Sequence, residues 1–339
     1  MPGRRLGLGL LRPLLLALSA ALLLLLAGSW SPRRRRPSPL SPPPPPPPPA
    51  APVTSARGLK RDRPGCCREP ALYGHHRSLR WHIELQPWAS PQHSLEDEAA
   101  RFLVYISTTQ VDCSDVAEKG MTDHPEEMQD PWAVCLDNSF QLARQMQSQR
   151  CRIYSVGLRS GDRSFEEGMS RAGCEVHYLD PSVREAHLQQ SQGYWHHRLA
   201  LDWREPNPSS NDHHRAVSTK KLAVIMQRFG HSKIDVLKAD VESAEWKILE
   251  NLILENVVED IGQLVLAVHL HWAGFEVGGT DSDVVRYWYS LLKELELRGF
   301  KLFRSYKNMS KPQVFLQREG FNASSSYTLS WVNTQWAQR

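Results

Sequence analysis

The chain has 339 residues and a formal net charge of +4, which is long enough for one large domain or two modest ones. The excess of positive charge comes from the arginines of the first 36 residues, and the remainder of the chain is close to neutral. A basic surface of the kind that binds nucleic acid is therefore not expected, and we predict no nucleic-acid partner.

The amino-terminal 28 residues contain an apolar run at 14–27 that follows three arginines. The length of this run and the small residues after it favour a secretory signal peptide in 1–28 over a full membrane span. An uncleaved signal anchor is the alternative, and only in that case would the protein be bound to a membrane. Both interpretations predict that the folded part is secreted or lies in the lumen of the secretory pathway.

Residues 29–95 begin with arginine and proline runs, which cannot bury a core and favour extended polyproline conformation. We therefore expect a disordered linker over 29–95 and a folded domain over 96–339. The six cysteines are compatible with disulfides in an oxidising compartment, but the sequence does not select a pairing. Asn308 and Asn322 each begin an Asn-X-Ser sequence, which predicts N-glycosylation of both.

Apolar residues of the folded part recur with helical spacing in some stretches and as short β-prone runs in others. Helices are predicted at 95–106, 131–148, 165–172, 182–192, 218–229, 243–256 and 284–299. Strands are predicted at 153–156, 175–179, 195–201, 233–240, 262–271, 300–306 and 312–318. Helices and strands alternate until the last two strands, which follow each other directly. This order predicts an α/β fold with a doubly wound, Rossmann-like, mostly parallel sheet and an antiparallel carboxy-terminal hairpin.

Residues 151–181 form the most informative unit, a strand, a glycine-containing turn, a helix and a second strand. An open parallel sheet binds its ligand at the carboxyl ends of its strands, where an acid can accept hydrogen bonds from a ribose. The unit therefore predicts a nucleoside-bearing cofactor. Its candidate binding residues are Val156, Gly157, Gly161, Asp162 and Asp180. A turn aspartate preceding Pro181 is the alternative role for Asp180.

Arg159 stands where a GxGxxG turn would carry its second glycine. A dinucleotide needs that glycine because the backbone must approach the pyrophosphate. S-adenosyl-L-methionine has no phosphate, so the turn favours this methyl donor over NAD or FAD.

Acidic residues follow the predicted strand 233–240. Asp240 and Glu242 lie at its carboxyl end, and we predict that they are catalytic, orienting or deprotonating an acceptor. Lys238 and Glu245 are candidate substrate-binding residues. Glu245 has a second interpretation, an acid in the first turn of a helix, where the helix dipole favours negative charge.

His269 and His271 lie two residues apart at the end of the next strand, on the same face. We predict that His269 is catalytic together with the acids and that His271 contacts the substrate. A metal site or hydrogen-bonded structural histidines are the alternatives, and no metal ligand is assigned. The pairs His75-His76, His196-His197 and His213-His214 are expected in surface loops.

Several of these motifs together carry a resemblance to a known family: Ser155-Val156-Gly157, Gly161-Asp162, Ser164-Phe165-Glu166, Asp180-Pro181 and LKADVESAEW at 237–246. From about Glu96 to Arg318 the chain resembles FkbM-type S-adenosylmethionine-dependent methyltransferases, in which a lysine and an Asp-X-Glu-Gly-X-Glu core follow the fourth strand. The resemblance implies a class I methyltransferase fold and, for most members, O-methyl transfer. Arg159, Ser243 and Ala267 depart from the family pattern.

Methyl transfer to an oxygen or nitrogen of a small-molecule, glycan or protein acceptor is therefore the leading hypothesis. A Golgi-type glycosyltransferase, with Asp240 and Glu242 as a DxD-like motif, is the alternative enzyme. A secreted binding domain that keeps the fold without turnover is the alternative that is not an enzyme.

Overall fold

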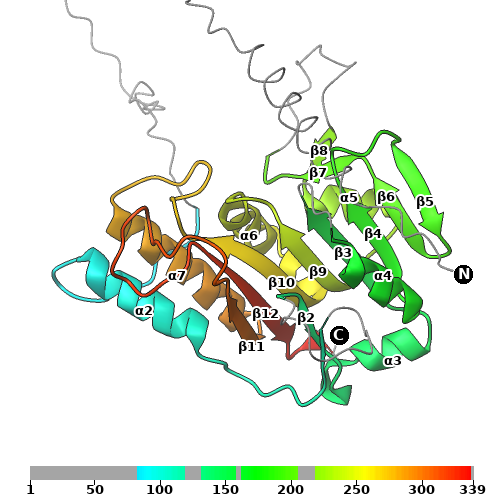
Figure 1. Ribbon diagram of the computed structural model, residues 1–339, viewed down its shortest axis with the longest axis horizontal. Coiled ribbons are helices and arrows are strands. Elements are labelled where there is room, and N and C mark those ends of the chain that lie inside the picture. Colours follow the sequence, from blue (N-terminus) through cyan, green and yellow to red (C-terminus); the bar gives the residue numbers. More distant parts are fainter. Residues whose placement is uncertain (1–81, 119–130, 158–161, 205–217, 337–339) are drawn as a thin grey trace, which may run out of the picture. The chain divides into compact units, whose positions relative to one another are not determined.

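The computed structural model describes residues 82–118, 131–157, 162–204 and 218–336 (Figure 1). The signal or anchor predicted in 1–28 and most of the predicted linker lie outside these residues. The chain divides into two units, Met1–Leu72 and Tyr73–Arg339, and all described residues belong to the second unit. Within the described residues, no helix combines the length and the apolar character needed to cross a membrane.

The folded chain begins ahead of residue 96. Ile83 is buried, the His82 amide donates to Glu250 in α6 (Glu245–Leu254), and the Gln86 amide donates to Ser290 in α7 (Asp281–Leu297). Residues 82–95 were predicted as the end of the disordered linker, but contacts of His82, Ile83 and Gln86 attach this segment to the domain.

An eight-stranded sheet forms the centre of the unit, in the order β11-β12-β10-β9-β3-β4-β6-β5. Its strands are β3 (Arg152–Gly157), β4 (Glu175–Leu179), β5 (His187–Ser191), β6 (Tyr194–His197), β9 (Ile234–Asp240), β10 (Ile261–His269), β11 (Phe300–Lys307) and β12 (Ser326–Asn333). Strands β6, β4, β3, β9 and β10 run parallel, whereas β12 is antiparallel to both β10 and β11. The predicted doubly wound sheet with an antiparallel carboxy-terminal hairpin is confirmed.

The direction of the winding reverses between β3 and β9. From β3 the chain continues to β4 and β6 on one side, and it then returns to β9 and continues to β10 on the other side (Figure 1). Gly157 and Asp240, the last residues of β3 and β9, are paired in register. A reversal of this kind opens a crevice at the carboxyl ends of the two strands, where ligands bind in open α/β sheets.

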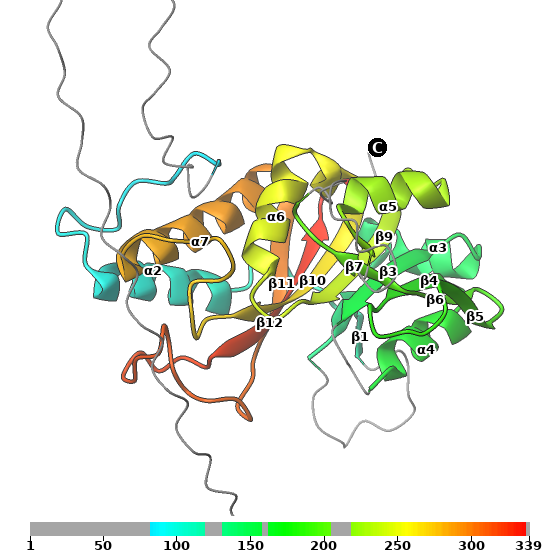
Figure 2. The same ribbon diagram turned by 90° about the horizontal axis from the view of Figure 1, so that it is seen from above.

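Helices cover both faces of the sheet (Figure 2). Strand residues alternate between the faces: Leu237 and Leu264 pack with α2 (Leu95–Ser107), α5 (Leu222–Phe229), α6 and α7, whereas Val236 and Val265 pack with α3 (Leu142–Gln147) and α4 (Ser164–Arg171). Nearly every residue of β9 and β10 is buried, because helices cover both faces of these strands and apolar side chains are needed on each face.

The single long helix predicted at 131–148 is wrong. The segment instead forms β2 (Ala133–Cys135), a short 3-10 turn (Asn138–Phe140) and α3, with Gln141 at a positive φ between the last two. β2 pairs antiparallel with β1 (Val116–Glu118), and this distant pairing decides the conformation of residues whose apolar spacing alone suggests a helix.

Two further element predictions are also wrong. The predicted helix at 182–192 contains strand β5, because Gly193 turns the chain at φ +78 and β5 pairs antiparallel with β6. The predicted strand at 312–318 forms only an isolated bridge, because Leu316 and Gln317 have positive φ values that interrupt extended backbone. β12, the strand that completes the hairpin, lies later in the chain.

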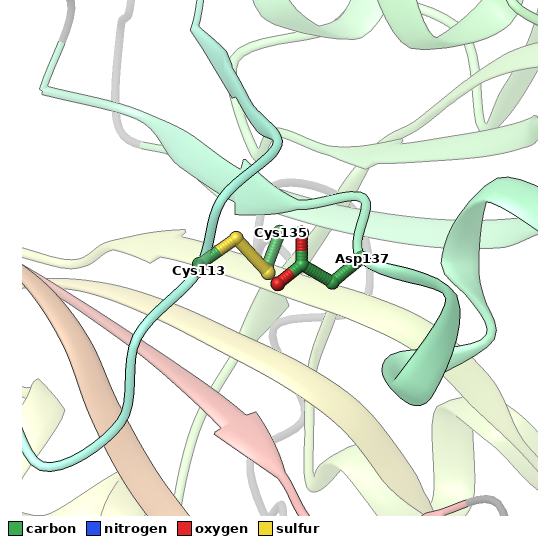
Figure 3. A group of neighbouring side chains, drawn as sticks. All are labelled: Cys113, Cys135 and Asp137. Carbon is green, nitrogen blue, oxygen red and sulfur yellow. A yellow bond between two sulfur atoms is a disulfide. The ribbon is translucent and has the colours of Figure 1, made fainter.

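The described part of the chain contains two disulfides. Cys113 is bonded to Cys135, next to Asp137, whose carboxylate accepts the amides of Ser114 and Asp115 (Figure 3). Cys151 is bonded to Cys174, and this bridge connects the amino ends of β3 and β4. Because both sulfurs beside Asp137 are consumed in a disulfide, that group offers no thiolate for a metal ion.

Candidate active site

A cavity of about 190 Å³ lies at the carboxyl ends of β3, β4 and β9 and beside the short strands β7 (Leu199–Leu201) and β8 (Ser218–Lys220). The residues around it are Val156, Gly157, Pro181, Ala200, Leu201, Asp202, Trp203, Arg204, Thr219, Val241, Ala244 and Phe275. The cavity therefore lies at the reversal point of the sheet, where the sequence places the cofactor.

Two of the predicted cofactor residues line this cavity, and two others follow the carboxyl ends of β3 and β4. Val156 and Gly157 line the cavity directly. Asp180 follows β4 and is buried, and its Oδ1 accepts the Ser182 amide at 2.7 Å, so one carboxylate oxygen is already used by a turn. Asp162 accepts the Ser164 amide at 2.9 Å at the start of α4. Gly161 lies outside the described residues.

Asp202 is a cavity residue that sequence reasoning missed. It directly follows β7 and is buried, and its Oδ2 accepts Nη2 of Arg204 at 3.0 Å, while its Oδ1 accepts the Arg204 amide at 3.0 Å. The available signal was an acid immediately after the apolar Leu-Ala-Leu run. This position falls between a predicted strand and a predicted loop, and the sequence pattern assigned it no role.

Aromatic side chains form one wall of the cavity. The rings of Trp203 and Phe275 stack with centroids 6.3 Å apart, and Trp272 meets Phe275 edge-on at 5.0 Å. Nε1 of Trp272 donates to Oγ of Ser243 at 2.6 Å, which fixes this wall to the turn after β9. Gly274 has a φ of +99, and a Cβ there would lie 3.0 Å from the Ser243 carbonyl oxygen, so the two turns approach each other as backbone.

The turn after β9 has an uncommon backbone conformation. Glu242 and Ser243, neither of them glycine, have φ values of +46 and +74. Such conformations cost free energy and persist only where surrounding contacts enforce them, as they commonly do at functional sites. Glu242 is exposed, whereas Ser243 is buried.

The turn leads into a chain of three ionisable groups. Oε1 of Glu245, which is buried, accepts the His269 amide at 2.6 Å and lies 3.2 Å from Nδ1 of the same residue. The other ring nitrogen of His269, Nε2, lies 3.9 Å from Oδ1 of Asp240. A buried carboxylate thus orients the imidazole, whose far nitrogen faces a carboxylate that is 43 % exposed. In the described residues, no hydrogen-bond partner is present for Oδ1 of Asp240.

The two predicted histidines have opposite electrostatic surroundings. Burial acts to lower the pKa of His269, but the hydrogen bond to Glu245 and the charges of Glu245, Asp240 and Glu242 outweigh it and raise that pKa. For His271, burial and the neighbouring His269 charge lower the pKa. The two rings meet edge-on with centroids 6.1 Å apart. The structure therefore brings Asp240, Glu245 and His269 together, with His271 next to them.

Lys238 lies two residues before Asp240 in β9, but its side chain is bound by α4 and takes no part in the Glu245–His269–Asp240 group. Its Nζ donates to Oε1 of buried Glu166 in α4 at 2.6 Å, and Oγ of Ser155 donates to the same oxygen at 2.5 Å. The lysine also lies over the ring of Trp132, 4.4 Å from its centroid. The buried pair of Lys238 and Glu166 therefore connects β9 and β3 to α4, and neither residue lines the cavity.

The remaining predicted positions are dispersed. His196 and His197 were expected in a surface loop, which is wrong, since both are buried in β6. Asn308 is half-buried and Asn322 is exposed, both at the loop between β11 and β12.

Comparison with known proteins identifies the family to which the chain belongs. A family model described as a methyltransferase domain matches residues 76–311, so the chain belongs to this methyltransferase family. The assignment confirms the predicted class and favours methyl transfer over glycosyl transfer, while the finer FkbM resemblance stays a prediction.

Among curated proteins, the chain is 57% identical over 273 residues to "Probable methyltransferase-like protein 24" of Rattus norvegicus, which covers 80% of this chain and 75% of that protein. It is 56% identical over 279 residues to the protein of the same name from Homo sapiens, covering 82% and 76%. Among solved structures, the D21A mutant of a 16S rRNA (adenine(1408)-N(1))-methyltransferase from Catenulisporales acidiphilia aligns with a TM-score of 0.27 and 14% identity over 60% of this chain and 96% of that one.

Proposed function

We propose that the protein transfers a methyl group from S-adenosyl-L-methionine to an oxygen or nitrogen acceptor. The observation that carries this proposal is the cavity at the reversal point of the sheet, with the Glu245–His269–Asp240 chain following the neighbouring strands. Membership of a methyltransferase family supports methyl transfer as the type of reaction. The site offers residues that could bind the methyl donor and others that could bind and deprotonate the acceptor.

The residues around the cavity fit a nucleoside-bearing methyl donor. Buried acids at the ends of β4 and β7, Asp180 and Asp202, are suited to accept hydrogen bonds from ribose hydroxyls or a base amine. Leu201, Val241 and Phe275 offer apolar and aromatic surface for a base. No phosphate-binding glycine is required at Arg159, since this donor carries no phosphate.

S-Adenosyl-L-methionine supplies an electrophilic methyl group on a sulfonium, so the protein has to align an acceptor and remove its proton. The side chain of Asp240 is partly exposed, and its buried Oδ1 has no hydrogen-bond partner among the described residues, so this carboxylate is suited to bind an acceptor hydroxyl or amine. Asp240 or His269 would take up the proton that the acceptor loses on methylation. Glu245 acts through His269 and is a positioning residue.

Binding of the product S-adenosyl-L-homocysteine to the full chain, measured by calorimetry, tests the donor half of this proposal without knowledge of the acceptor. We expect one site per chain and a loss of about 10-fold or more in affinity for Asp180→Asn, because hydrogen bonds to a charged group contribute about 1.5–3 kcal/mol. Asp281→Asn, which removes an exposed acid paired with Arg318, is the matched control and should bind like the wild type. Absence of binding by the folded wild type would refute the proposal.

We further propose that the protein works in the lumen of the secretory pathway or outside the cell. Support comes from the apolar run at 14–27 and from the two disulfides, which persist in oxidising compartments. The full chain expressed in mammalian cells should lose mass on treatment with an N-glycosidase. An Asn308→Gln/Asn322→Gln double variant should not, and an unmodified wild-type chain confined to the cytosol would contradict this location.

A further inference from the structure

A second group of ionisable side chains lies far from the candidate active site, on the face of the sheet that α5 covers. It contains Glu175 and His177 of β4, His197 of β6 and His231, which follows α5. The ring of Phe229 at the end of α5 stacks on His177 with centroids 5.2 Å apart. His231 precedes the amino end of β9, whereas Asp240 ends that strand, and the strand rise separates the two ends by about 20 Å.

Three donor atoms of this group converge on one point. Oε1 of Glu175 lies 3.1 Å from Nε2 of His177 and 3.9 Å from Nε2 of His231. All three atoms lie within 4.8 Å of one another. Ligands held at about 2.0–2.1 Å in a tetrahedral zinc site are about 3.4 Å apart, so small side-chain rotations would bring these atoms to that spacing.

The opposite side of each ligand is already fixed. Nδ1 of His177 lies 2.9 Å from Nε2 of His197, and Nδ1 of His231 lies 2.7 Å from the hydroxyl of Tyr154. With Nδ1 protonated in both rings, each Nε2 presents the lone pair that a metal ion needs. Nε of Arg152 donates to Oε2 of Glu175 at 3.1 Å, which turns Oε1 toward the two imidazoles. Supporting hydrogen bonds of this kind orient the ligands of protein metal sites.

The group is accessible to solvent only on the side of Glu175. The side chains of His177 and His231 are 7 % and 9 % exposed, whereas that of Glu175 is 37 % exposed. A metal ion could therefore enter past the carboxylate and retain a water molecule as a further ligand. Two imidazoles and one carboxylate select zinc and related transition metals over magnesium or calcium, which prefer oxygen ligands.

We propose that Glu175, His177 and His231 form a binding site for a divalent transition metal ion of the zinc type. Bound there, the ion would join β4 to the connection between α5 and β9, at the end of the sheet away from the candidate active site. The guanidinium of Arg152 on the far carboxylate oxygen adds a nearby positive charge, so the site would hold the ion less tightly than one with two carboxylates.

Metal titration of the full chain, prepared without a histidine tag and dialysed against EDTA, tests the site. We expect one equivalent of Co²⁺ to produce the visible absorption of a tetrahedral complex and one equivalent of Zn²⁺ to displace it. His177→Gln/His231→Gln should lower the Zn²⁺ affinity more than 100-fold. His213→Gln/His214→Gln, which removes as many imidazoles elsewhere in the chain, should leave the affinity unchanged.

Tyr154→Phe keeps the buried ring and removes only the hydroxyl that contacts His231, so it provides a variant that should fold normally. We expect its Zn²⁺ affinity to fall about 10-fold, the lower end for loss of a group that orients a ligand. Circular dichroism melts check the fold of each variant, and the partly exposed Glu175→Gln replaces the histidine pair if that pair does not fold. A wild-type chain without stoichiometric Co²⁺ and Zn²⁺ uptake, or ligand variants that bind as tightly as wild type, would overturn the proposal.

Discussion

His269 is held between two carboxylates, and this position sets both its orientation and its charge. Glu245 accepts its amide and faces Nδ1, while Asp240 faces Nε2. Since the nearby negative charges outweigh burial and raise the pKa of His269, the folded protein binds this proton more tightly than the unfolded chain does.

The pH dependence of stability should reveal this proton. A group whose pKa is raised on folding stabilises the protein fully below its unfolded value of about 6.5, and this contribution is lost as the pH rises through the folded pKa. We therefore expect the melting temperature of His269→Gln to fall furthest below wild type at pH 5–6, roughly by a few degrees. The gap should narrow as the pH rises above neutrality.

His271→Gln is the matched control, because the pKa of His271 is lowered instead. Its stabilising contribution is present above pH of about 6.5 and is lost as the pH falls below that value. The two variants should therefore show opposite trends across the same series of melts. Equal trends would contradict the assigned surroundings of His269.

At the scale of elements, the turn between β9 and α6 combines a functional position with an unfavourable backbone conformation. Ser243 has a φ of +74, and its Oγ accepts Nε1 of Trp272 at 2.6 Å. The hydroxyl thus holds the aromatic wall of the cavity, while the backbone conformation would suit glycine, the residue of the family motif that this chain resembles.

Replacement of Ser243 by glycine or alanine separates these two effects. Both variants lose the hydrogen bond to Trp272, but only glycine relieves the strained backbone. We expect Ser243→Gly to be more stable than Ser243→Ala by about 1 kcal/mol in the free energy of unfolding measured with urea. At Ser148, where φ is −87 at the end of α3, the same pair should show the reverse order. If Ser243→Ala were as stable as Ser243→Gly or more stable, the backbone of Ser243 would not be strained.

At the scale of the whole molecule, local patterns predicted the parts of the fold that local chemistry decides. Apolar periodicity and glycine turns located β3, α4, β4, β9, α6, β10 and α7 close to their observed bounds. The failures at 131–148, 182–192 and 312–318 arise where pairing with another strand or positive φ values decide the conformation. β2 needs β1, β5 needs β6, and the last strand is defined by β10 and β11.

The candidate site was predictable to the same extent. Acids and histidines at the ends of adjacent parallel strands meet because of the topology, which explains why Asp240 and His269 were expected together. The contact of Lys238 could not be predicted from the sequence, because its partner Glu166 belongs to α4, which covers the face of the sheet opposite α6. The contact between His177 and His231 through Glu175 depends on the order of the strands and leaves no trace in sequence spacing.

The stability of the whole domain should depend on its redox state. The two disulfides close loops with sequence separations of 22 and 23 residues that do not overlap, and each should contribute about 3 kcal/mol by restricting the unfolded chain. Separate loops act almost additively, so full reduction should cost about 6 kcal/mol, which is comparable to the total stability of a typical domain.

Urea unfolding of the full chain with and without a phosphine reductant measures this loss. Alkylation followed by mass spectrometry confirms that the four cysteines of the two disulfides are free after reduction. Cys66→Ser/Cys67→Ser, which leaves both disulfides intact, is the control and should unfold like the wild type. We expect the reduced chain to be largely unfolded in the absence of urea, because the lost stability approaches the total. An unchanged urea midpoint with alkylated cysteines would show that packing between α-helices and sheet holds this fold without its disulfides, and it would remove one support for a luminal location.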